Sequence, residues 1–111
     1  MLIEKAYSSY TDFRIPGMVA TKMGSLIRYC ECRRSASDWA DIDNKISRSD
    51  DGGENWETVL LIESGGNTLN NPVMIVNGSG LVFLYCKNYK EIWKRVSFDD
   101  GKRQRCRNQK A

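Results

Sequence analysis

The chain has 111 residues, of which 41% are hydrophobic and 28% charged, and this composition is typical of one globular domain. It contains no histidine, which excludes Ser-His-Asp and Cys-His catalysis and zinc sites built on histidine. The formal net charge of +3 comes from the last eleven residues, which carry five Lys or Arg and no acid, so the rest of the chain is not a surface for polyanions.

Seven segments rich in β-branched and aromatic residues predict β-strands, and no segment shows the period of a long helix. In chain order they cover residues 17–21, 25–32, 43–48, 56–62, 72–76, 81–86 and 91–96. Clusters that contain Gly, Asn or Asp follow several of these segments, at 22–24, 50–53, 63–67, 77–80 and 99–101, and such residues close short turns. Strands joined by short turns predict an all-β fold of antiparallel hairpins rather than a parallel sheet.

One turn carries a motif that recurs along the chain. The segment from Ser49 to Trp56 reads S-x-D-x-G-x-x-W, and 48 residues later Ser97 begins the same S-x-D-x-G pattern. In such a turn Ser and Asp bond to backbone N–H groups, Gly adopts the required backbone angles and Trp packs on the sheet. We therefore expect a structural role for Ser49, Asp51, Gly53 and Trp56. A period of about 45 residues with four short strands is typical of β-propellers, so the sequence predicts about two four-stranded antiparallel blades.

Other motifs follow one another in a fixed order. They are Phe-Arg-Ile-Pro at 13–16, Glu-Cys-Arg-Arg at 31–34, Ser-Asp-Trp-Ala-Asp-Ile-Asp at 37–43, the turn motif at 49–56 and Asn-Pro-Val at 71–73. This ordered set resembles the N-terminal part of the exo-α-sialidases (neuraminidases), whose repeated turn motif is the Asp-box (BNR) repeat. The resemblance implies an incomplete six-bladed propeller at 13–101, preceded by a lead-in at 1–12 and followed by a basic tail at 102–111 that we expect to be disordered.

The resemblance also implies a role for three charged residues. Sialic acid carries a carboxylate on its anomeric carbon, and a guanidinium binds a carboxylate through two parallel hydrogen bonds. By resemblance, Arg14 belongs to the arginine triad that binds this carboxylate, Arg33 contacts the substrate beside it, and Asp38 is the general acid/base. The remaining triad arginines, a nucleophilic Tyr and its Glu belong to later blades, which are missing from this chain. We therefore expect the chain alone to be inactive.

Each of these residues also has an interpretation that involves no substrate. Arg14 could be a surface arginine of a strand, Arg33 could form a solvated pair with its neighbour Arg34, and Asp38 could be an exposed acid of a turn. Trp39 either lines the sugar pocket or caps the blade. The four cysteines show neither zinc-ligand nor disulfide spacing, so we expect reduced thiols.

The expected partner is a sialylated glycan substrate, with no cofactor and no metal. The alternative is a non-catalytic Asp-box propeller module that binds a glycan or a protein without turnover. Such a module does not need a general acid like Asp38. We expect no nucleic-acid partner. The longest apolar run, residues 59–62, is too short to span a membrane, and the first five residues lack the apolar core of a signal peptide. The cellular compartment is not indicated.

Overall fold

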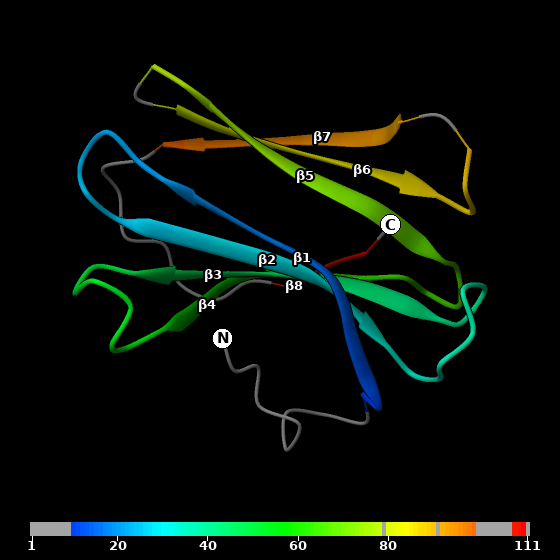
Figure 1. The fold of residues 1–111 in the computed structure, drawn as a ribbon. Helices are drawn as coiled ribbons and strands as arrows, with labels where there is room; N and C mark the ends of the chain where they lie inside the picture. The colour runs from blue at the N-terminus through cyan, green and yellow to red at the C-terminus, as the bar shows by residue number, and fades with distance from the viewer. Residues whose placement is uncertain (1–9, 79, 91, 100–107, 111) are drawn as a thin grey trace.

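The computed structural model describes residues 10–78, 80–90, 92–99 and 108–110, and of residues 92, 93, 98, 99 and 108–110 it describes the backbone only. These residues form eight strands arranged in two stacked sheets (Figure 1). No helix, and so no helix that could cross a membrane, occurs among them. The prediction of an all-β fold built from antiparallel hairpins is confirmed.

The first sheet contains four consecutive antiparallel strands. They are β1 (Asp12–Ala20), β2 (Leu26–Arg33), β3 (Ile42–Ser49) and β4 (Glu57–Glu63). The fifth member, β8 (Asn108–Lys110), pairs in parallel with β4, which otherwise forms an edge with unpaired backbone groups. The sequence predicted no element at β8. The rest of the basic tail, 102–107 and 111, lies outside the described residues, as does most of the predicted lead-in.

The second sheet is a three-stranded antiparallel meander. It consists of β5 (Leu69–Asn77), β6 (Gly80–Lys87) and β7 (Ile92–Asp99). All seven predicted strands are therefore present, and sheets of four and three antiparallel strands are consistent with part of a propeller. The second S-x-D-x-G turn begins in β7 at Ser97, but its Gly101 lies outside the described residues.

The core lies between the two sheets. Ile27, Ile46 and Ile62 of the first sheet are fully buried, and they belong to one cluster with Phe83 of the second sheet. The ring of Phe83 meets Tyr29 of β2 edge to face, with 5.6 Å between the ring centroids. Because side chains alternate along a strand, the face of β2 that carries residues 27 and 29 also carries residues 31 and 33. Charged side chains therefore continue this core toward one end of the molecule.

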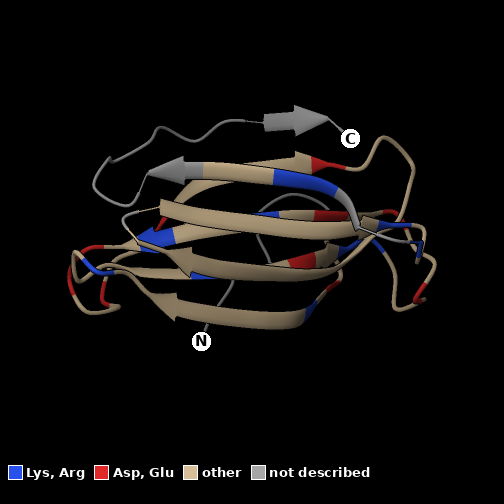
Figure 2. Ribbon diagram, turned by 90° about the horizontal axis from the view of Figure 1, so that it is seen from above, with Lys and Arg blue, Asp and Glu red and all other residues tan. Residues whose placement is uncertain are grey.

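Two groups of loops mark the two ends of the molecule. Loop 34–41, the start of β1 and the β6–β7 turn lie at one end, whereas the turn at 49–56 and the β1–β2 and β5–β6 turns lie at the other (Figure 1). Acidic and basic residues occur together around both ends (Figure 2). The motif residues 14, 33 and 38 belong to the first end.

Candidate functional site

The centre of the site is Arg33, the last residue of β2, whose side chain is only 3% exposed. Its Nε and Nη2 donate to Oε1 of Glu31 at 3.0 and 2.7 Å, and its Nη1 donates to Oδ1 of Asp38 at 2.8 Å. Glu31 and Arg33 lie two residues apart on one strand, so their side chains share a face. The guanidinium is therefore held between two carboxylates.

The electrostatics of this group keep Arg33 charged. Burial by itself would lower the pKa of Arg33, but the hydrogen bonds from Asp38 and Glu31 outweigh burial, and the pKa is raised above its ordinary value. Glu31 is also buried, and its Oε2 accepts the backbone N–H of Asn71 in β5 at 2.9 Å. The ion pair thus connects the two sheets at this end.

Asp38 lies in loop 34–41, and its side chain is 68% exposed. The loop is closed at its base by the N–H of Arg34, which donates to the carbonyl of Asp41 at 3.2 Å. Near its tip the N–H of Trp39 donates to Oγ of Ser37 at 3.0 Å. One carboxylate oxygen of Asp38 thus bonds to a buried cation while the group as a whole faces solvent, where a ligand can reach it.

Arg14 lies on the same face of the sheet but does not join this pair. Its partner in the β1–β2 register is Glu31, and that of Asp12 is Arg33, so opposite charges alternate across the two strands. The Nε of Arg14 donates to Oδ2 of Asp12 at 2.7 Å, and this bond lowers the pKa of Asp12. The side chain of Arg14 remains 47% exposed. It is followed by a bulge in which Ile15 has a φ of 52°, an unusual value for a β-branched residue.

Two contacts of the site were not predicted from the sequence. Glu31, which holds Arg33, belongs to a motif but received no role, although the E-x-R spacing in a strand places both side chains on one face. Tyr89 in the β6–β7 turn donates its hydroxyl to the main-chain carbonyl of Asp38 at 2.8 Å. Its ring lies 4.7 Å from that of Trp39, between centroids. No local sequence pattern indicates a contact across 51 residues.

A second charged network lies on the opposite face of the first sheet. Nη2 of Arg34 and the hydroxyl of Tyr10 both donate to Oδ2 of Asp43, at 2.8 and 2.5 Å. Burial would raise the pKa of Asp43, but these two bonds, the N–H of Ser64 and the charge of Arg34 together outweigh it, and the pKa is lowered. Asp41 accepts from both Arg34 and the hydroxyl of Ser64. Arg34 is thus bound to the start of β3, and it does not form a solvated pair with Arg33.

The Ser49–Trp56 turn forms a compact set of hydrogen bonds at the far end. Oγ of Ser49 accepts the N–H of Gly53 at 2.9 Å, and Oδ1 of Asp51 accepts those of residues 54 and 55 at 3.1 and 2.9 Å. The bonds from Asn55, backbone and side chain, and from Ser49 lower the pKa of Asp51 to about 2. The indole N–H of Trp56 donates to the carbonyl of Gly53 at 2.9 Å.

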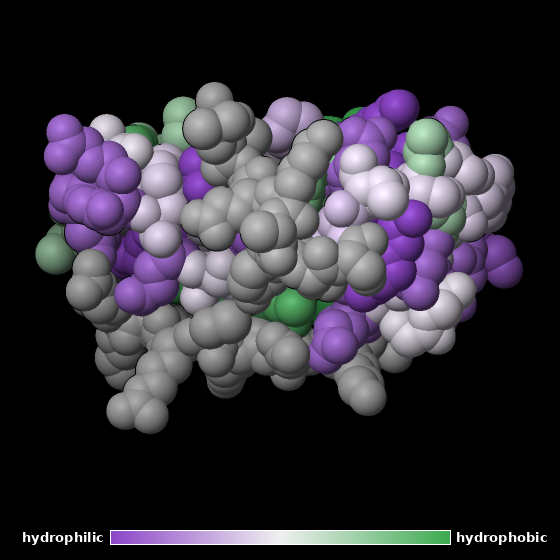
Figure 3. Space-filling model, turned by 90° about the horizontal axis from the view of Figure 1, so that it is seen from below, coloured by the Kyte–Doolittle hydropathy of each residue, from purple (hydrophilic) through white to green (hydrophobic). Residues whose placement is uncertain are grey.

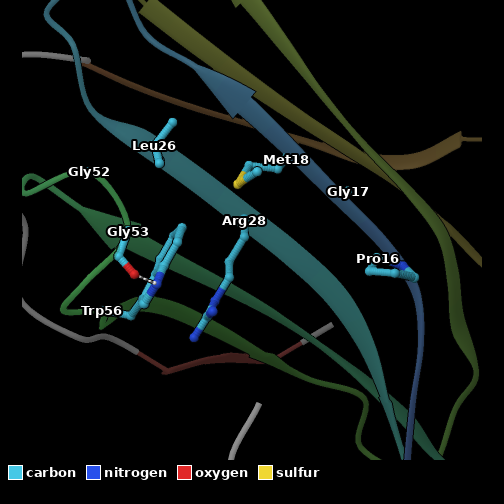
Figure 4. Close-up of a pocket in the computed structure, with 8 residues that line it drawn as sticks. All are labelled: Pro16, Gly17, Met18, Leu26, Arg28, Gly52, Gly53 and Trp56. Carbon is cyan, nitrogen blue, oxygen red and sulfur yellow. Dashed lines mark hydrogen bonds between the residues drawn. The ribbon is translucent and has the colours of Figure 1, made fainter. Parts of the chain in front are cut away.

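A pocket of about 470 Å³ opens beside this turn (Figure 4). Trp56 and Arg28 line it, with the Arg28 guanidinium 4.0 Å from the centre of the indole ring. Met18 and Leu26 supply apolar parts of the lining. The pocket contains none of Arg14, Arg33 and Asp38. No group of three or more potential metal ligands occurs among the described residues.

Comparison with known proteins shows a partial similarity. No family model matches the chain. A sialidase of Bacteroides fragilis (strain YCH46) is 34% identical over 76 aligned residues, which take in 59% of this chain and 14% of that protein. The chain thus spans a small part of the length of this relative, and the similarity supports a sialidase-like relationship.

Proposed function

We propose that this chain is the N-terminal part of an exo-α-sialidase and that Arg14, Arg33 and Asp38 belong to its substrate site. The observation that carries the proposal is the buried Arg33, which Glu31 holds in place while the exposed Asp38 lies against it. A buried cation beside an accessible carboxylate is suited to holding an anionic substrate next to a group that can transfer a proton. The partial similarity to a protein named sialidase supports sialic acid as the substrate class.

The two arginines supply the binding part of this chemistry. Arg14 is half exposed and can offer its guanidinium to the carboxylate of a sialoside through two charge-assisted hydrogen bonds. Arg33 lies on the same face and is fixed by Glu31, so its charge is preorganised rather than mobile. A substrate carboxylate that approaches this face competes with Asp12 and Asp38 for the two guanidinium groups.

Asp38 supplies the acid/base part. Once it is protonated, its carboxyl gives the proton to the glycosidic oxygen as the bond between that oxygen and the anomeric carbon breaks, and the leaving sugar departs as an alcohol. The resulting carboxylate takes a proton from the water that completes hydrolysis. The nucleophile that sialidases use is a tyrosine, and in this proposal it comes from the part of the protein beyond this chain.

Hydrolysis by the chain together with the remaining propeller tests the proposal. Asp38→Asn should lose most activity on a sialylated oligosaccharide but much less on an activated aryl sialoside, whose leaving group departs without protonation. Asp41→Asn is the matched control, because Asp41 lies in the same loop but pairs with Arg34. Equal losses of Asp38→Asn on both substrates would exclude Asp38 as the acid. If the unmodified longer protein binds sialosides without cleaving them, the non-catalytic binding module is correct instead.

A further inference from the structure

The β6–β7 turn holds a tyrosine in a backbone conformation that tyrosine rarely adopts. Asn88 and Tyr89 have φ values of 55° and 60°, and the N–H of Lys90 donates to the carbonyl of Lys87 at 3.2 Å. Two successive residues with positive φ form the kind of hairpin turn in which Asn and Gly are preferred. Asn88 fits this preference, whereas a bulky side chain at the next position is unfavourable. Such residues persist where surrounding contacts hold them, and they concentrate at functional sites.

The contacts of Tyr89 connect the second sheet to the loop that carries Asp38. Its N–H donates to Oδ1 of the buried Asn70 in β5 at 3.1 Å, which anchors the turn on its own sheet. Its hydroxyl donates to the main-chain carbonyl of Asp38 at 2.8 Å, and its ring lies against Trp39 at a tilt of 58°. Figure 1 shows that loop 34–41 and the β6–β7 turn lie at the same end of the molecule.

Asp38 has two such anchors to the rest of the chain, and the carbonyl of the nearby Ala40 accepts the hydroxyl of Thr68 at 2.6 Å. The side chain of Asp38 bonds to Arg33, and its main chain bonds to Tyr89. The hydrogen bonds of Ser37 and of the Trp39 N–H stay inside the loop. The side chain of Trp39 is 65% exposed, so little burial holds the tip in place. The hydroxyl of Tyr89 therefore fixes the main chain from which the Asp38 carboxylate reaches Arg33.

We infer that Tyr89 is a positioning residue, which holds the main chain of Asp38 from the second sheet so that the Asp38 carboxylate stays on Arg33. The catalytic meaning of this inference rests on the proposed function, but the positioning does not. Burial and the neighbouring Asp38 raise the pKa of Tyr89, so its phenol keeps the proton that it donates. Tyr89 acts in this arrangement through its hydrogen bond rather than as a nucleophile.

The test compares two variants that each lose one phenolic oxygen. Tyr89→Phe in the 111-residue chain removes the bond to Asp38 and retains the ring against Trp39. Tyr85→Phe is the control, because the hydroxyl of Tyr85 is buried and has no hydrogen-bond partner among the described residues. The probes are the main-chain ¹³C resonance of the Asp38 carbonyl and the hydrogen exchange of the Arg34 and Ala40 amides, which both bond inside the loop.

In Tyr89→Phe we expect the Asp38 carbonyl resonance to move and exchange of the two amides to become about two- to tenfold faster, as for the loss of one hydrogen bond. Tyr85→Phe should change neither. An unchanged carbonyl resonance and unchanged exchange in Tyr89→Phe would overturn the inference, whatever the ligand behaviour.

Binding of N-acetylneuraminic acid to the same variants, made in the chain together with the remaining propeller, separates the two proposals. A looser loop together with weaker binding, also by about two- to tenfold, supports both. A looser loop together with an unmodified longer protein that does not bind the acid leaves the positioning role standing and contradicts the proposed function. A looser loop with unchanged binding shows that Tyr89 positions the loop but that the loop position does not serve the ligand, which overturns the functional part of the inference.

Discussion

Arg33 and Arg14 lie on the same face of the first sheet, but their surroundings differ sharply. Arg33 is almost fully buried and shares its guanidinium between Glu31 and Asp38, whereas Arg14 pairs with Asp12 at the surface. A buried charge that loses its partner is strongly destabilising, while an exposed ion pair contributes little to stability. The two arginines can therefore be distinguished by their effect on folding.

Arg33→Ala should lower the free energy of unfolding by about 3–5 kcal/mol, because it leaves the buried Glu31 carboxylate without its cation. Arg14→Ala should lower it by about 0–1 kcal/mol. Urea denaturation of both variants and of the unmodified chain measures the difference. Similar losses in the two variants would show that Arg33 is not the buried centre of the charged cluster.

How far the sequence identifies the site depends on how local each contact is. Arg14, Arg33 and Asp38 belong to short ordered motifs, and the E-x-R spacing is enough to place Glu31 beside Arg33. The contact of Tyr89 with Asp38 depends instead on how the second sheet packs on the first, which no short pattern encodes. The pairing of Glu31 with Arg33 thus follows from a local spacing, although no role was predicted for Glu31, whereas the residue that holds Asp38 from the other sheet could not be predicted.

Among the elements, the Ser49–Trp56 turn is closed by hydrogen bonds between its own residues. Its acid, Asp51, accepts hydrogen bonds from Asn55 and Ser49, and its pKa is lowered to about 2 from an ordinary value of 3.8. A carboxyl whose pKa is lower in the folded state stabilises the fold at pH values above its unfolded pKa. That stabilisation is lost as the pH falls through the folded pKa.

Asp51→Asn should therefore be less stable than the unmodified chain at pH 5, and the difference should shrink as the pH falls from about 4 to 2. Denaturation at a series of pH values measures this change. Glu54→Gln serves as the control, because the Glu54 side chain makes none of the described hydrogen bonds of the turn. A difference between Asp51→Asn and the unmodified chain that stays constant with pH would contradict the assignment.

The strand boundaries show which parts of the strands the sequence pattern does not predict. The first and fifth strands begin earlier than predicted, at Asp12 and Leu69, because each contains a bulge around a proline. In both bulges the residue before the proline, Ile15 or Asn71, has a positive φ. Proline and irregular backbone break the alternating pattern on which a strand prediction relies. Because of the bulges, the N-terminal ends of these two strands were not predicted, although the rest of each strand was.

At the scale of the whole molecule, the two sheets share one core. Phe83 is fully buried and meets Tyr29 of the first sheet, so it connects the sheets directly. Phe83→Ala should lower the free energy of unfolding by about 3–5 kcal/mol and weaken both sheets together. Ile75→Ala, at a half-exposed position of β5, should change it by about 0.5 kcal/mol or less.

Hydrogen exchange resolved by residue measures whether both sheets respond. Loss of protection in β5–β7 of Phe83→Ala, with unchanged protection in β2 and β3, would contradict a shared core.

The outer surface of the molecule differs in hydropathy from the core between the sheets. In Figure 3 the described residues are hydrophilic toward both ends, with a hydrophobic patch between them. Because the shared hydrophobic cluster lies between the sheets, cooperative folding is expected to depend on their inner faces.

The central claim, that Arg14, Arg33 and Asp38 belong to a site for the carboxylate of sialic acid, is tested most directly by NMR titration of the ¹⁵N-labelled chain together with the remaining propeller, which supplies the other triad arginines. The ligand is N-acetylneuraminic acid, and its methyl ester, which lacks the charge, is the matched control. We predict saturable shifts of the Nε–H resonances of Arg14 and Arg33 and of the amide of Asp38 with the acid but not with the ester. No shifts, equal shifts with both ligands, or shifts confined to Arg28 and Trp56 would contradict the claim.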